Sequence, residues 1–148
     1  MTHMLLALSL SLAAAAPVIT LERGACFGSC PVYKLSIFAD GRVEFEGKEF
    51  VKRKGKARGQ ITKAALQSLV REFEKINYMK LDNEYVSEGP NCPEYWTDLP
   101  AAVTSLDWKG KKKRIRHYHG CRGLAVLDQL TALEDKIDQV VNTKRWIE

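Results

Sequence analysis

The chain has 148 residues, enough to bury one hydrophobic core, and its 45% hydrophobic and 28% charged contents are ordinary for a globular protein. It contains no internal repeat, low-complexity segment or linker, which argues against repeat and multidomain architectures. The formal net charge of +5 favours anionic partners.

The first residues differ in composition from the rest. The run MTHMLLALSLSLAAAAP is apolar and ends in small residues before Pro17. About 12 apolar or small residues are too few to span a bilayer, but they match a secretory signal cleaved near Ala15. No Lys or Arg precedes the apolar stretch, so a buried N-terminal helix is the alternative. We predict a signal peptide at residues 1–16 and a single mature domain at residues 17–148 without a transmembrane segment. The protein is then exported, to the periplasm or outside the cell.

All four cysteines, Cys26, Cys30, Cys92 and Cys121, lie in the predicted mature chain. Outside the cytosol an even number of cysteines predicts disulfides, although three pairings are possible. The alternative is a metal-binding or redox-active thiol pair in the CxxxCP motif, which locally resembles the copper-binding loop of Sco-type copper chaperones. Redox pairs are usually two residues apart at a helix N-terminus. Here the spacing is three, and Pro31 leads into a strand.

Period-two alternation predicts most of the N-terminal half to be strands. A first strand is expected at residues 18–22, and a second begins at Tyr33, whose alternation predicts one buried face. Asp40-Gly41 predicts a two-residue turn of the primed type, followed by a return strand with Val43 and Phe45 inward. Residues 49–53 extend this meander, and the basic residues 54–59 are expected to form a turn.

Two segments have helical periodicity, and a second hairpin lies between them. Thr62 is expected to cap the first helix, whose apolar stripe is Leu66, Leu69, Val70, Phe73 and Ile76. A long loop spans residues 77–100, and a hairpin turns at residues 109–111. The last helix follows Gly123, with a stripe of Leu124, Leu127, Leu130, Leu133, Ile137 and Val140. The order β-β-β-α-β-β-α predicts a two-layer α+β fold, with an antiparallel sheet of about five strands and both helices on one face. The other face would be open to solvent.

The HYHGC segment is a candidate metal site. On an extended strand, His117, His119 and Cys121 point to the same side, as metal ligands must. Ile115 shares that side, so we interpret His117 as a core histidine that donates to a backbone carbonyl. The metal alternative would use Cys26, Cys30, His117 and His119.

Lysine and arginine are concentrated at residues 52–58 and 109–116. On the open sheet face we expect a basic, aromatic surface made of Lys34, Phe38, Arg42, Arg114, Arg116 and Tyr118. Such a surface suits an anionic envelope component, such as phospholipid headgroups or acidic polysaccharide, or another envelope protein. Export argues against nucleic acid. The alternative is a solvated face on which Glu44 and Glu46 partly neutralise the arginines.

No catalytic motif appears in the sequence. Asp98 in TDLP could serve as a general base, but Asp is also typical of turns, and we predict that role. The region of Asp135 and Asp138 is interpreted as a solvated helix face. We therefore predict a protein that is not an enzyme and that needs no cofactor.

The segments CFGSCPVYKLSIFADGRVEFEG, TDLP, KRIRHYHGC and ALEDKID, with the closing RWI, together resemble an uncharacterised family of exported bacterial proteins that carry a domain of unknown function. The resemblance implies a small secreted α+β domain with no assigned activity. It also implies that Cys26 pairs with Cys30 and Cys92 with Cys121. The resulting prediction is a non-enzymatic binding or structural module, stapled by two disulfides. The alternative is a periplasmic metal-handling protein of the copper type, or a thiol-redox protein.

Overall fold

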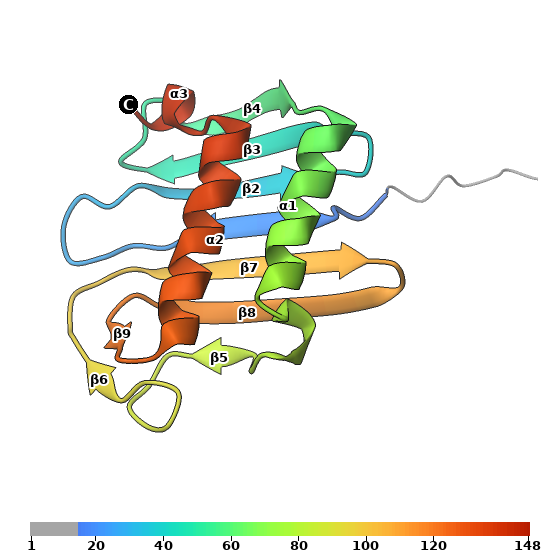
Figure 1. Cartoon of the computed structure of the whole chain (residues 1–148). Helices are drawn as coiled ribbons and strands as arrows, with labels where there is room; N and C mark the ends of the chain where they lie inside the picture. The colour runs from blue at the N-terminus through green and yellow to red at the C-terminus, as the bar shows by residue number, and fades with distance from the viewer. Residues whose placement is uncertain (1–14) are drawn as a thin grey trace, which may run out of the picture.

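The computed structural model describes residues 15–148. A twisted sheet forms one layer, and helices α1 (Lys63–Lys75) and α2 (Ala125–Val141) lie side by side across one of its faces (Figure 1). The predicted signal peptide lies outside the described residues except for Ala15 and Ala16. Among the helices of residues 15–148, none combines the length and apolar character needed to cross a membrane.

Within residues 15–148, the main sheet has seven strands in the order β4-β3-β2-β1-β7-β8-β5, so β1 lies at its centre. Its strands are β1 (Ile19–Arg23), β2 (Val32–Ile37), β3 (Arg42–Glu49), β4 (Gly55–Gln60), β5 (Glu84–Tyr85), β7 (Ala101–Trp108) and β8 (Lys111–Tyr118). All pairs are antiparallel except β5 with β8. Two short strands, β6 (Glu94–Tyr95) and β9 (Cys121–Arg122), pair separately. The predicted α+β class is confirmed, with more strands than the five expected.

The core lies between the sheet and the two helices. Cross-strand partners such as Leu21, Leu35 and Phe45 are completely or almost completely buried beneath them. Helix α1 begins as predicted, because the Thr62 hydroxyl accepts a hydrogen bond from the Ala65 amide at 3.0 Å. Both helices therefore present their apolar stripes to one sheet face, and the other face is left open.

The basic segment at residues 54–59 is not the predicted turn. It forms most of the edge strand β4, in which the small residues Ala57 and Gly59 pair with Phe45 and Val43 of β3. A side chain at Gly59 would collide with Arg145 and Trp146, which belongs to the short helix α3 (Lys144–Ile147). Because small residues replace large apolar ones on the inner face, the strand carries no readable hydrophobic alternation.

The two hairpin turns differ from each other. In the first, the Gly41 amide donates to the Phe38 carbonyl, and only Gly41 has a positive φ, of 83°. That geometry is a type I turn with a glycine bulge, so the predicted primed turn is wrong here. The turn at residues 109–111 has positive φ at both Lys109 and Gly110, as the primed type requires.

The predicted loop at residues 77–100 contains short regular elements. A 3-10 helix (Tyr78–Lys80) is followed by β5 and β6. The Tyr78 hydroxyl is hydrogen-bonded to the Thr104 hydroxyl at 2.8 Å in the core. This contact fixes the start of the connection against β7.

Candidate functional site at the loop end of the sheet

Three connections meet at one end of the main sheet, which we call the loop end. They are residues 24–31 between β1 and β2, residues 50–54 between β3 and β4, and residues 94–100, which comprise the short strand β6 and the chain from it to β7 (Figure 1). They are neighbours because antiparallel partners place these turns at the same end. Segments far apart in the chain thus form one surface.

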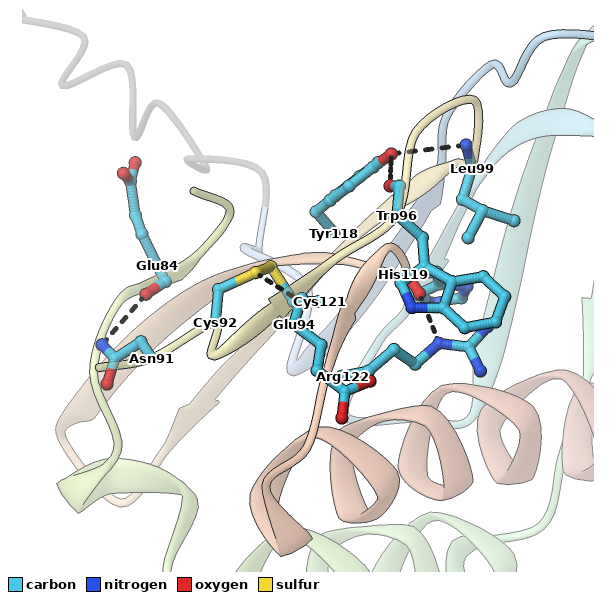
Figure 2. The surroundings of a disulfide bond; sticks show 10 residues. All are labelled: Glu84, Asn91, Cys92, Glu94, Trp96, Leu99, Tyr118, His119, Cys121 and Arg122. Atoms are coloured by element: carbon cyan, nitrogen blue, oxygen red, sulfur yellow. Dashed lines mark hydrogen bonds between the residues drawn. A yellow bond between two sulfur atoms is a disulfide. The ribbon is translucent and has the colours of Figure 1, made fainter. Parts of the chain in front are cut away.

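Two disulfides anchor this region. Cys26 is bonded to Cys30, which closes a small ring within residues 24–31. Cys92 is bonded to Cys121, which ties the long connection to β9 (Figure 2). The pairing implied by the family resemblance is confirmed. All four sulfurs are therefore held in structural cross-links.

Large aromatic side chains are exposed on these connections. The exposed fractions are 87% for Phe27, 56% for Trp96, 54% for Phe50 and 43% for Tyr95. Within residues 15–148, these four are the exposed large hydrophobic side chains, and all belong to the three connections of the loop end. We call this set the aromatic rim. Exposed apolar side chains gathered in one place usually mark an interaction site.

Backbone and side-chain contacts hold the rim in place. The Phe27 amide donates to the Asp98 carbonyl at 3.1 Å, which joins two of the three connections. The Tyr118 hydroxyl donates to the Trp96 carbonyl at 2.5 Å (Figure 2). The Arg122 guanidinium lies 5.1 Å from the centre of the Trp96 ring, within cation–π range. Asp98 has φ of 71° in this bend, in agreement with its predicted turn position.

Behind the loop end, helix α2 places Glu134 over strand β8. His117 Nδ1 donates to Glu134 Oε1 at 2.8 Å, and His119 Nε2 donates to Oε2 at 2.7 Å. Glu134 is only 1% exposed, and this burial acts to raise its pKa. The hydrogen bonds and the electrostatic attraction from the two histidines together outweigh burial, so the pKa of Glu134 is lowered from its ordinary value. The prediction that His117 donates to a backbone carbonyl is wrong, because the acceptor for its Nδ1 is the carboxylate of Glu134 on α2.

A second ion pair extends this buried network. Arg23 donates to Asp138 from Nε at 3.1 Å and from Nη2 at 2.7 Å, and the Tyr33 hydroxyl donates to Asp138 at 2.9 Å. Burial and the neighbouring Asp138 carboxylate raise the pKa of Tyr33 well above its ordinary value. Arg23 Nη1 also lies 3.8 Å from Glu134. The interpretation of Asp138 as solvated is wrong, whereas Asp135 beside it is indeed 68% exposed.

One group in this network has the composition of a metal site. Ligand atoms of His117, His119 and Glu134 all lie within 4.8 Å of one another, and a cavity of about 140 Å³ borders both histidines. The predicted alternative joined these histidines to Cys26 and Cys30, but those sulfurs are bonded to each other. Sequence reasoning missed Glu134. The available signal was a carboxylate within the apolar stripe of the last helix, next to Leu133.

The predicted binding residues of the open face are only partly free. Glu22 lies 3.4 Å from Lys34 and 3.6 Å from Arg114, and Arg42 lies 3.7 Å from Asp40. Arg116 is exposed on the same face, and the Tyr118 hydroxyl is engaged at Trp96. Phe38 is buried, with the Arg42 guanidinium 4.1 Å above its ring, so its predicted exposure is wrong. The role of these residues in binding stays a prediction.

Comparison with known proteins identifies a family without an assigned activity. No curated protein matches the chain. A protein-family match covers residues 17–141, which is most of the chain, and the family is described as a domain of unknown function, DUF6438. The chain therefore belongs to the DUF6438 family.

Proposed function

We propose that this protein is an exported, non-enzymatic binding module that presents the aromatic rim to a partner in the cell envelope. In this proposal residues 1–16 are removed as a signal peptide, and residues 17–148 act as a single domain. The observation that carries the proposal is the gathering of four exposed aromatic side chains on three connections at one end of the sheet. The two disulfides are compatible with an oxidising compartment outside the cytosol.

The disulfides also give the rim a physical advantage in binding. Ordering a loop when a partner binds consumes part of the binding free energy, and a loop that is already held avoids this loss. Cys26–Cys30 restrains the connection that carries Phe27, and Cys92–Cys121 restrains the one that carries Trp96. Aromatic side chains are frequent among the residues that dominate binding energy. The open face is a weaker candidate, because Lys34 and Arg114 already lie beside Glu22.

Two measurements test this proposal. Intact-mass analysis of protein recovered from its host should show a chain that has lost residues 1–16 and has no free thiol. Retention on an immobilised, detergent-free envelope fraction should fall in a Phe27→Ser/Trp96→Ser variant. It should remain unchanged in an Arg114→Ser/Arg116→Ser control on the open face. A full-length chain with free thiols would contradict export, and unchanged retention of the rim variant would contradict the binding surface.

A second candidate function is metal handling. The observation that favours it is the proximity of His117, His119 and Glu134, a ligand set that suits Zn²⁺. Titration of the oxidised protein with Zn²⁺ and Cu²⁺, and of the reduced protein with Cu⁺, tests it. Tight one-to-one binding that is lost in His119→Gln would support this function. Absence of tight binding to all three ions would remove it, without affecting the binding module.

A further inference from the structure

One corner of the loop end carries a cluster of positive charge beside the aromatic rim. We call it the basic corner, and it consists of Lys48, Lys52, Arg53 and Lys54, all exposed and all within four residues of Phe50. Within the described residues, none of the four forms an ion pair with a carboxylate. These charges are therefore available to a negatively charged partner.

The backbone of the basic corner is held by hydrogen bonds, and of its side chains that of Arg53 donates from Nη2 to the Lys56 carbonyl at 3.1 Å. The Lys52 amide donates to the Ile147 carbonyl at 3.3 Å, and the Arg53 amide donates to the Trp146 carbonyl at 2.8 Å. These bonds attach the connection to α3. Phe50 adopts a left-handed backbone conformation, with φ of 51°, and its side chain is more than half exposed. An apolar ring and several cations thus project from one anchored turn.

We propose that the aromatic rim and the basic corner together dock on the surface of a bilayer that contains anionic phospholipids. This inference rests on the proposed binding function and names its partner. Tyr and Trp favour the membrane interface, where an apolar ring meets polar headgroups. Lysine and arginine side chains are attracted to the negative surface of a bilayer that contains anionic lipids. The rim and the corner combine both interactions on one end of the molecule.

The arrangement suits a membrane better than a peptide groove. The four exposed aromatic residues belong to three separate connections, and these connections lie one after another along the end of the sheet (Figure 1). Such separated contacts fit a deformable interface. Glu49, Glu94, Asp98 and Glu148 are carboxylates of the same region, the last of them next to the α3 segment that bonds the Lys52 amide. They are outnumbered by the four cations of the basic corner together with Arg122 and Arg145. The net charge facing the bilayer is therefore positive.

Vesicle co-sedimentation of the disulfide-intact mature protein tests this proposal. The vesicles contain either phosphatidylcholine alone or phosphatidylcholine mixed with phosphatidylglycerol. We expect binding only to the anionic vesicles, and we expect that binding to weaken as salt is raised. Lys52→Glu/Lys54→Glu should weaken the partition coefficient at least about tenfold. Phe27→Ser/Phe50→Ser should weaken it at unchanged net charge.

The matched control is Lys109→Glu/Lys111→Glu, which changes the net charge equally at the turn between β7 and β8, at the opposite end of the sheet from the loop end (Figure 1). It should weaken binding by less than about threefold, because those charges lie away from the docked end and are screened. An equal loss in both charge variants would show attraction by net charge alone and would overturn the proposal. So would absent binding to anionic vesicles, or undiminished binding of the Phe27→Ser/Phe50→Ser variant.

The two proposals fail separately. Suppose that the wild type binds neither kind of vesicle but is retained by the envelope fraction through Phe27 and Trp96. That result overturns membrane docking and leaves the binding module standing, with a protein as its partner. Circular dichroism and a thiol count on every variant must match the wild type, so that a loss of binding reports on the surface and not on folding.

Discussion

Replacing Glu134 with Gln should strongly destabilise this protein. The Glu134 carboxylate is 1% exposed, accepts one hydrogen bond from each of two histidines at 2.8 and 2.7 Å, and lies 3.8 Å from Arg23. Gln has nearly the same shape, but it has one acceptor oxygen and no charge. One histidine then faces an NH₂ group in place of an acceptor oxygen. Arg23 also loses part of the negative charge that balances its own positive charge.

Removing one partner of a buried ion pair typically costs 3–5 kcal/mol, and each hydrogen bond to a charged group is worth about 1.5–3 kcal/mol. Because Gln keeps one acceptor, we expect a loss of about 3 kcal/mol in the free energy of unfolding. Urea titration at neutral pH, with disulfides intact and a chelator present, measures it as a lower midpoint at constant slope. The chelator separates this effect from any bound metal.

Asp135→Asn is the matched control. Asp135 is the next residue on α2, is 68% exposed and pairs with the same Arg23. Exposed pairs are worth about 0–1 kcal/mol, so this variant should lose less than about 1 kcal/mol. If Glu134→Gln lost no more than Asp135→Asn, the view of Glu134 as an ionised, paired carboxylate would be refuted.

The wild type and Glu134→Gln should also differ in how their free energy of unfolding depends on pH. The pKa of Glu134 in the folded state lies below its ordinary value of 4.5. The carboxylate therefore stabilises the fold fully above about pH 4.5, and this contribution is lost as the pH falls through the lower folded value. The difference between wild type and Glu134→Gln should shrink in that acidic range. If the difference in free energy of unfolding between the two proteins grew on acidification, the lowered pKa of Glu134 would be contradicted.

Three further predictions concern the fold. Cys92→Ala/Cys121→Ala opens a ring with a sequence separation of 29 and should reduce the free energy of unfolding by about 3.5 kcal/mol, measured by urea titration. Gly41→Ala should cost about 2 kcal/mol by the same assay, because φ is 83° and the added Cβ meets a backbone carbonyl. Thr104→Val removes the hydroxyl group that is hydrogen-bonded to the buried Tyr78 hydroxyl and should cost about 1–3 kcal/mol. A double-mutant cycle with Tyr78→Phe should recover most of that loss.

Local sequence patterns were sufficient for the elements whose side chains alternate or recur clearly. The spacing of apolar residues was enough to predict helix α1 with its Thr62 cap and the strands around Leu35 and Phe45. Each of these elements buries one face and exposes the other to solvent. Strand β4 had no such signal, since Ala57 and Gly59 fill its inner face. Its position depends on backbone pairing with β3 and on the packing of α3.

The sequence by itself determined the α+β class, because a strand or a helix that buries one face must carry a period of two or of 3.6 residues. Only the tertiary structure decided that Glu134 meets His117 and His119, and that Phe27 lies beside the Asp98 bend. These partners are separated by 15 to 71 residues, and no local period connects them. Their contacts arise from the strand order and from the path of α2 across the sheet, which are properties of the folded chain as a whole.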